Sequence, residues 1–261
     1  MNRWKKILLA LATLAALLVM AQNKPLDPFE EAQKQRQQFK DTFGVLPGEL
    51  YSANGEELYF KKRGPKNVTL EGCDFGLGAG VLEGAYARLP RYFADTRQVE
   101  DLDTRIRTCM LRLQGFKPDQ IVREDVLALA AFVASKSSKM PIHVELKTGA
   151  EAQLYNLGKE LWYYRAGVRD MNCATCHDSK AGARIRLSPL KSPKQGLSDE
   201  WPAYRFEVDK LYTLEDRIQF CYSSIAVSPP AHYSEPVIAL SLYMRYQANG
   251  KLLTELPGFT R

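Results

Sequence analysis

One stretch of the chain, Cys173-Ala-Thr-Cys176-His177, holds two thiols and an imidazole at a spacing that has a defined chemistry. Two cysteines at this spacing lie one helical turn apart and can add across the two vinyl groups of a haem, with the adjoining histidine under the iron. The alternative is a redox or zinc-binding cysteine pair followed by a chance histidine. The chain has only three histidines and no second Cys-x-x-Cys. The motif therefore predicts one covalent haem c, attached to Cys173 and Cys176, with His177 as an axial ligand.

Three of the five cysteines remain, Cys73, Cys109 and Cys221, so at least one thiol has no cysteine partner. An internal repeat relates them. Matching pairs recur 112 residues apart: Pro90 and Pro202, Arg105 and Arg217, Cys109 and Cys221. The run from Glu124 to Leu129 matches the run from Glu235 to Leu240 at a spacing of 111 residues. We therefore predict a mainly α fold of two tandem cytochrome c-like domains, with core helices at Val126–Ala134 and Val237–Tyr246.

The first copy has lost the haem motif. In the turn that starts at Cys73, Gly76 and Leu77 occupy the places of the second cysteine and the histidine, so no haem can be attached there in the usual way. Because Cys109 is the counterpart of Cys221, we expect it close to Cys73. We predict a disulfide between Cys73 and Cys109 that replaces part of the lost core, with two free buried thiols as the alternative.

The second axial position of the haem has five candidates: Cys221, His143, His232, Met171 and Met244. Methionine or histidine is the usual choice in cytochromes. The repeat favours Cys221, since its counterpart Cys109 is expected beside Cys73. His232, in a loop after two prolines, is the stronger rival.

Arg217 precedes Cys221 by four residues, which places both side chains on one face of a helix. A guanidinium there would lower the pKa of the thiol and would offer a bidentate site for an oxyanion. Arg105 stands in the same relation to Cys109, where no chemistry is expected. The arginine is therefore either a substrate-binding residue or a structural feature of the repeat.

Residues 1–21 predict a cleaved secretory signal, in which Arg3, Lys5 and Lys6 precede an apolar run and a small-residue cleavage site at Ala21. The run is shorter than the ~20 apolar residues of a spanning helix, although a retained anchor is the alternative. The mature chain has 33 basic and 30 acidic residues, too small an excess to indicate nucleic acid. We expect a periplasmic protein without a stable membrane anchor after cleavage.

The repeat also sets the expected domains. Residues 22–67 form an N-terminal extension that contains an exposed helix near residues 25–40, and residues 68–145 form the haem-free domain. Residues 146–261 form the haem-binding domain. The second copy is longer mainly at residues 187–200, which are rich in Ser, Pro and Lys and predict a surface loop beside the haem.

Several segments together resemble the SoxA family of the periplasmic thiosulfate-oxidising system. They are Cys173–His177 with Asp178, Gly182-Ala-Arg184-Ile-Arg186, Trp201-Pro-Ala-Tyr-Arg205, Arg217-x-x-x-Cys221, Cys73-Asp-Phe-Gly-Leu-Gly78 and Leu89-Pro-Arg-Tyr-Phe93. The similarity covers approximately residues 68–261. It is more specific than the haem motif alone because the segments follow in order.

The resemblance implies the larger subunit of a SoxAX cytochrome, in which the second-domain haem is the active one. In that family the cysteine that matches Cys221 is the distal haem ligand and is found as a persulfide, and the arginine that matches Arg217 binds substrate. The family joins thiosulfate oxidatively to a cysteine of the carrier SoxYZ and passes two electrons to the partner cytochrome SoxX. Two-haem members have a complete motif in the first domain, so this chain resembles the single-haem subgroup.

Two other functions stay open at this stage. A plain electron-transfer cytochrome would use Cys221 or His232 only as an iron ligand and would show no thiosulfate-dependent coupling. A thiosulfate dehydrogenase would form tetrathionate from thiosulfate alone, without a carrier. If thiosulfate is the substrate, Lys191 or Lys194 of the long loop is a further candidate to bind the anion.

Overall fold

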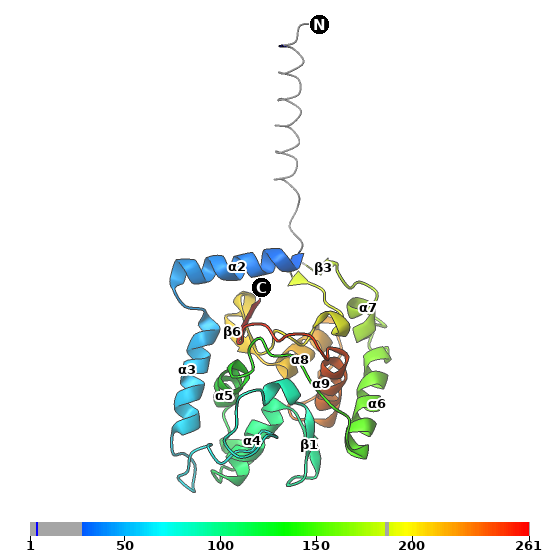
Figure 1. The fold of residues 1–261 in the computed structure, drawn as a ribbon. Helices are drawn as coiled ribbons and strands as arrows, with labels where there is room; N and C mark the ends of the chain where they lie inside the picture. The colour runs from blue at the N-terminus through cyan, green and yellow to red at the C-terminus, as the bar shows by residue number, and fades with distance from the viewer. Residues whose placement is uncertain (1–3, 5–27, 186–187, 261) are drawn as a thin grey trace.

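The computed structural model describes residues 4, 28–185 and 188–260, and the fold is mainly helical (Figure 1). The predicted signal at 1–21 lies outside these residues apart from Trp4. The α-helices are α2 (Pro28–Phe43), α3 (Pro47–Phe60), α4 (Leu102–Arg112), α5 (Arg123–Ser135), α6 (Gly149–Tyr163), α7 (Cys173–His177), α8 (Leu214–Ser224) and α9 (Glu235–Gln247). Short 3-10 turns are η1 (Tyr86–Arg88), η2 (Pro118–Gln120), η3 (Pro193–Gln195) and η4 (Phe206–Val208). The strands are β1 (Arg91–Phe93), β2 (Gln98–Glu100), β3 (Arg184–Ile185), β4 (Ser188–Pro189), β5 (Ala203–Arg205), β6 (Lys210–Tyr212) and β7 (Gly258–Thr260).

Two pairs of helices, α3 with α5 and α6 with α9, form the most extensive helix contacts (Figure 1). Both pairs cross at a glycine. A Cβ atom at Gly55 would lie 2.0 Å from the carbonyl oxygen of Ala128, and one at Gly158 would lie 2.1 Å from that of Ala239. Only glycine lets the backbones approach this closely. The predicted core helices 126–134 and 237–246 are confirmed, since they lie inside α5 and α9.

Two corresponding β-hairpins directly precede the helices that carry Cys109 and Cys221. A cis Leu89–Pro90 bond precedes the antiparallel pair β1–β2 and helix α4. A cis Trp201–Pro202 bond precedes β5–β6 and helix α8 in the same way, and β7 adds a parallel strand to β5. Both helices start at a residue whose side chain accepts the backbone N–H three positions on, Asp101 in α4 and Thr213 in α8.

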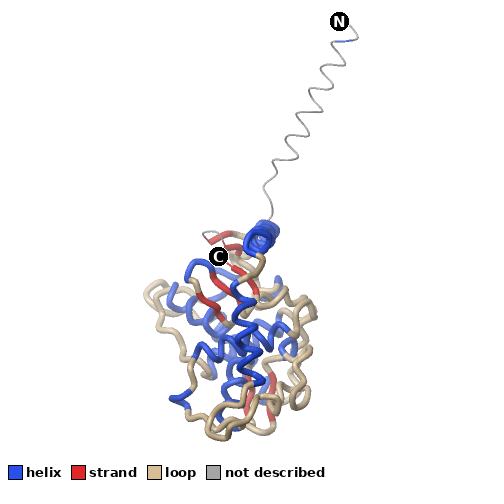
Figure 2. The backbone as a smooth tube through the Cα atoms, turned by 90° about the vertical axis from the view of Figure 1, so that its left-hand side faces the viewer, coloured by secondary structure: helices blue, strands red, loops and turns tan. Residues whose placement is uncertain are grey.

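Helix α3 lies in the segment that the sequence assigns to an N-terminal extension. Its side chains nevertheless join the main core, where Tyr59 is buried and packs 5.5 Å from the ring of Phe132 on α5. The helix expected near residues 25–40 is present as α2, which lies across one end of the body near the C-terminus (Figures 1 and 2). Phe39 anchors α2, with its ring centroid 5.0 Å from that of Phe259 on β7.

The predicted disulfide between Cys73 and Cys109 is present. Both cysteines are buried in the main core with Phe75, which is 1% exposed and lies in the turn that replaces a haem motif. Gly76 in this turn has a φ of +101°, and its carbonyl oxygen accepts a hydrogen bond from Arg91. Aromatic packing and a covalent bridge therefore fill the first half where the second half carries its haem motif.

The disulfide should act on stability alone. Replacing Cys73 and Cys109 with serine should lower the free energy of unfolding by about 4 kcal/mol, because the bridge closes a loop between residues 36 positions apart. The haem absorption spectrum should be unchanged, since Cys173–His177 lies elsewhere. Chemical denaturation followed by circular dichroism and by Soret absorption measures both quantities. Loss of haem at full stability would contradict this role.

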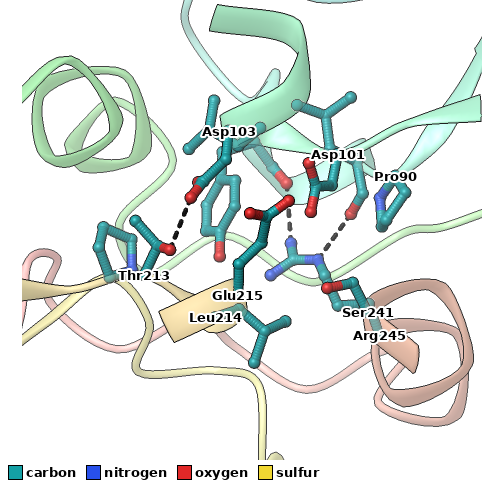
Figure 3. Close-up of a pocket in the computed structure, with 12 residues that line it drawn as sticks. Pro90, Asp101, Asp103, Thr213, Leu214, Glu215, Ser241 and Arg245 are labelled. Atoms are coloured by element: carbon teal, nitrogen blue, oxygen red, sulfur yellow. Dashed lines mark hydrogen bonds between the residues drawn. The ribbon is translucent and has the colours of Figure 1, made fainter. Parts of the chain in front are cut away.

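A cluster of buried acids lies where α4 meets α8 (Figure 3). Asp103 accepts a 2.6 Å hydrogen bond from the hydroxyl of Thr213 and is ion-paired with Arg123. Glu215 accepts from the backbone N–H of Tyr233. Burial, with repulsion from Asp103, raises the pKa of Glu215 to about 8.

The pKa of Glu215 predicts a pH-dependent stability. The usual pKa of a glutamate is 4.5. Between about pH 4.5 and 8 the folded protein therefore holds a proton on Glu215 that the unfolded chain has already released. Stability is thus highest below this range and falls as the pH rises through it, by up to about 5 kcal/mol for a shift of this size. Glu215→Gln should make the decline shallower, measured by urea unfolding from pH 5 to 8. The matched control is Glu124→Gln, because its own backbone N–H and Lys210 hold the Glu124 pKa below the usual value. An equally steep decline in Glu215→Gln would contradict the assignment.

Candidate haem and thiol site

The haem motif is held on the short helix α7 (Cys173–His177). Asn172 begins this helix, and its side-chain oxygen accepts the backbone N–H of Thr175 at 2.8 Å. The helix is fixed to α6 by Asp178, which accepts a 2.9 Å hydrogen bond from the indole N–H of Trp162. Both cysteines and the histidine are therefore presented on one well-anchored helical turn.

His177 is oriented for metal ligation. Its side chain is buried beside Trp162, with ring centroids 5.8 Å apart. The ring Nδ1 lies 2.8 Å from the carbonyl oxygen of Lys191. A hydrogen bond of this kind at Nδ1 fixes the orientation of a metal-binding imidazole and leaves Nε2 as the nitrogen that faces the metal.

Cys221 on α8 reaches His177 across the site. Burial alone would raise the pKa of the Cys221 thiol. The charge of Arg217, a hydrogen bond with His177 and the charge of Arg205 outweigh burial, and the pKa falls to about 7. The motif cysteines feel the charge of the Cys221 sulfur. Burial and then this charge raise the pKa of Cys176, and the same two causes raise the pKa of Cys173 to about 12. The structure thus brings the three predicted residues of the haem motif together with Cys221, the proposed second iron ligand.

The rival ligands lie elsewhere. Both ring nitrogens of His232 face carboxylates of α8, Nδ1 at 3.1 Å from Glu215 and Nε2 at 3.4 Å from Asp216. His143 is exposed and lies 3.7 Å from Glu145. Met244 is buried in the core of the second half. Of the candidates, Cys221 is the one with a hydrogen bond to His177.

Arg217 and Arg105 have different surroundings although they match in the repeat. Nη1 of Arg105 contacts Asp95 at 3.0 Å and Glu100 at 3.2 Å, and its Nε donates to the carbonyl oxygen of Asp74. The guanidinium of Arg217 lies over Trp201 and Phe220, 5.7 and 5.3 Å from the ring centroids. Within the described part of the chain Arg217 has no ion pair with a carboxylate. The first arginine is neutralised, and the second is available for an anion.

Of the two loop lysines, Lys191 is part of the framework of the site. Its ammonium group lies 2.8 Å from Asp199 and 3.7 Å from Glu200. Lys194 is exposed on η3. Arg186, one of the residues that carry the family resemblance, lies outside the described residues.

The residues at this site fit a haem c. The donor set is two thiols one turn apart, an oriented imidazole and a low-pKa thiol facing it. The surrounding second core contains large apolar side chains, among them Trp162, Trp201 and Tyr243. The chain therefore has apolar side chains to surround the macrocycle, two cysteines to form the thioether bonds and side chains to bind the iron.

Comparison with known proteins identifies the family. Residues 54–142 match the family described as "SoxA/TsdA, cytochrome c domain". The chain is 42% identical to the L-cysteine S-thiosulfotransferase subunit SoxA of Hydrogenobacter thermophilus, over 98% of this chain and 97% of that protein. The chain belongs to the SoxA family. The SoxA subunit of Hydrogenophilus thermoluteolus is 39% identical over 82% of this chain and 83% of that protein.

A solved relative has the same fold. The crystal structure of SoxXA from P. pantotrophus superposes with a TM-score of 0.71 at 23% identity, over 82% of this chain and 78% of that one. Membership of a family of L-cysteine S-thiosulfotransferase subunits with a cytochrome c domain confirms the expected enzyme class and haem c. No helix in the described residues is both long and apolar enough to cross a membrane.

Two features of the site were not predicted from the sequence. Arg205, on β5, stands where the first half has Phe93, and an alignment of the two halves at a spacing of 112 residues would have revealed this change. The buried acid cluster around Glu215 has no sequence signal of its own, because its members come from two halves that meet only in the folded protein.

Proposed function

We propose that this protein joins thiosulfate to a cysteine of a SoxYZ-like carrier protein, with Cys221 as the reacting sulfur and the distal iron ligand. The observation that carries the proposal is that Cys221 faces His177, next to the haem-attachment cysteines, with Arg217 one turn away on α8. Arg217 binds the sulfonate oxygens of thiosulfate, since a guanidinium suits an oxyanion and no carboxylate of the described residues occupies it.

The reaction forms one sulfur–sulfur bond between the carrier thiol and the sulfane sulfur of thiosulfate. One proton leaves the thiol and two electrons are released. A haem c bound to Cys173, Cys176 and His177 supplies the outlet for electrons, and a SoxX-like cytochrome c subunit is the partner that receives them. A persulfide on Cys221, which the family resemblance implies, would place a second soft sulfur beside the substrate.

We further propose one haem per chain, in a chain of two tandem cytochrome c-like domains. The matching helix crossings at Gly55 and Gly158 and the matching hairpins support the repeat. Gly76 and Leu77 in place of the motif, with Phe75 and the disulfide in the core, support a haem-free first domain. Since α3 packs on α5 as α6 packs on α9, we place the start of the first domain at Pro47 rather than at residue 68.

We propose a periplasmic location, which is supported by the predicted signal at residues 1–21 and by the disulfide, since disulfides are typical of oxidising compartments. We expect no stable membrane anchor after cleavage and no nucleic-acid partner.

The function is tested with the haem-loaded protein in complex with its SoxX-like partner. Thiosulfate, an oxidised cytochrome c as acceptor and the carrier should give a carrier peptide heavier by one thiosulfate group, seen by mass spectrometry. A carrier whose acceptor cysteine is replaced by serine is the control and should stay unmodified. Formation of tetrathionate without the carrier would favour a thiosulfate dehydrogenase. Reduction and reoxidation of the haem with no thiosulfate product would favour a plain electron-transfer cytochrome.

A further inference from the structure

Arg205 is a buried arginine with an unused donor. It lies on β5, is 3% exposed, and its Nη2 contacts Glu207 at 2.8 Å. Its Nη1 is buried and has no hydrogen-bond partner among the described residues. A buried donor without an acceptor costs free energy, and more so when it is charged. The side chain is therefore suited to a ligand that brings its own oxygen atom.

Arg205 and Arg217 converge on the same ring. The Arg205 guanidinium lies 4.4 Å from the centroid of Phe220, and that of Arg217 lies 5.3 Å from it. Phe220 precedes Cys221 directly on α8, and Arg217 lies one turn before Cys221 on the same helix. Two guanidinium groups thus lie over the ring of the residue next to Cys221.

The first half shows that this arrangement is not required by the fold. At the three matching positions it has Phe93, Glu100 and Thr108 where the second half has Arg205, Tyr212 and Phe220. Phe93 stacks on Arg105 with its centroid 3.9 Å from the guanidinium carbon, and Glu100 neutralises it. The second half has replaced a carboxylate and a neutral ring with a second cation and aromatic walls. Such a change favours an anion in the site.

We propose that Arg205 is a specificity-determining residue of the site, whose free Nη1 binds one oxygen of the terminal SO₃ group of a small sulfur oxyanion held by Arg217. This inference rests on the proposed function, because it takes thiosulfate as the substrate. Two guanidinium groups select a dianion over a monoanion and hold its SO₃ end, which leaves the sulfane sulfur free to face Cys221.

The test uses Arg205→Gln in the haem-loaded complex with its cytochrome partner. The KM for thiosulfate should rise about 10- to 100-fold, which corresponds to the loss of a hydrogen bond to a charged group. Competitive inhibition by sulfate, an unreactive oxyanion, should weaken by a similar factor. The kcat should change by less than about threefold, since the bond to the reacting sulfur is not removed. Arg205→Lys keeps the charge without the planar fork and should recover only part of the affinity.

Lys210→Gln is the matched control. Lys210 is opposite Arg205 in the β5–β6 register, and its substitution removes the same charge, yet its ammonium contacts Glu124 at 3.2 Å and is 44% exposed. Its loss should change the KM by less than about twofold, because exposed charges are screened by salt. If Lys210→Gln changed the KM as much as Arg205→Gln does, Arg205 would act only through its general positive charge, and the proposal would be overturned.

Two further results would overturn the inference. One is unchanged sulfate inhibition in Arg205→Gln. The other is a changed haem spectrum or haem content with unchanged anion affinity, which would assign Arg205 to a haem propionate. Equilibrium dialysis with labelled thiosulfate separates this inference from the proposed function. Wild-type protein that binds thiosulfate without coupling it contradicts only the function, and Arg205→Gln protein that binds as tightly as wild type contradicts only the role of Arg205.

Discussion

Replacing Cys221 with methionine should abolish the coupling of thiosulfate to the carrier while the haem stays attached. Cys173, Cys176 and His177 lie on α7 and are untouched, so the haem content should equal that of the wild type. Loss of a reacting nucleophile costs an enzyme about three orders of magnitude in rate or more. The midpoint potential of the haem should rise, because a neutral thioether replaces an anionic sulfur. Carrier mass spectrometry and spectroelectrochemical titration measure the two effects.

His232→Gln is the control for this prediction. His232 was the strongest rival ligand, but its ring faces Glu215 and Asp216. The control should keep both coupling and the haem spectrum. If Cys221→Met retained the wild-type spectrum and rate whereas His232→Gln lost them, the iron would be ligated by His232 and Cys221 would have no part in coupling.

Arg217→Ala should lower kcat/KM for thiosulfate about 100- to 1000-fold, the usual cost of removing a donor that holds a reacting oxyanion. Stability should change little, because Arg217 has no carboxylate partner in the described residues and stacks only on aromatic rings. Arg217→Lys keeps the charge but loses bidentate geometry, so we expect it to remain strongly impaired.

Arg105→Ala in the first half is the matched control, and its expected effect is the reverse. Arg105 is buried against Glu100, and its removal leaves a buried carboxylate unpaired, at a cost of about 3–5 kcal/mol of stability. Coupling per folded molecule should stay at the wild-type level. Thermal unfolding and steady-state coupling, measured on both variants, give the comparison. Unchanged kinetics in Arg217→Ala would make Arg217 a structural residue like Arg105.

The sequence was sufficient for the features that rest on covalent chemistry and on the repeat. The disulfide followed from the positions of Cys73 and Cys109, and the core helices followed from apolar periodicity. Periodicity missed the glycine crossing of α3 on α5, because Gly55 pairs with Ala128 through a close backbone approach that leaves no apolar pattern. For this reason the boundary predicted from the sequence leaves α3 outside the first domain, whereas we propose to include it.

The charge partners of the site residues were harder to predict from the sequence. Arg217 was a candidate, but only its contacts distinguish it from Arg105, since the two carboxylates that neutralise Arg105 lie outside its own helix. Lys191, one of the two loop lysines predicted as anion ligands, is paired with Asp199 in the fold. Partners of charged side chains come from distant segments, and a linear spacing does not give them.

The central claim is that Cys221 is the sulfur that faces the haem and reacts. Its most direct test is intact-mass and peptide mass spectrometry of the protein isolated from its native compartment, with its cytochrome partner and without reductant. The account predicts one haem on the peptide that contains Cys173 and Cys176, a bridge between Cys73 and Cys109, and the mass of one added sulfur atom on the Cys221 peptide. A second haem on the first half, or Cys221 joined by a disulfide to another cysteine, would contradict it.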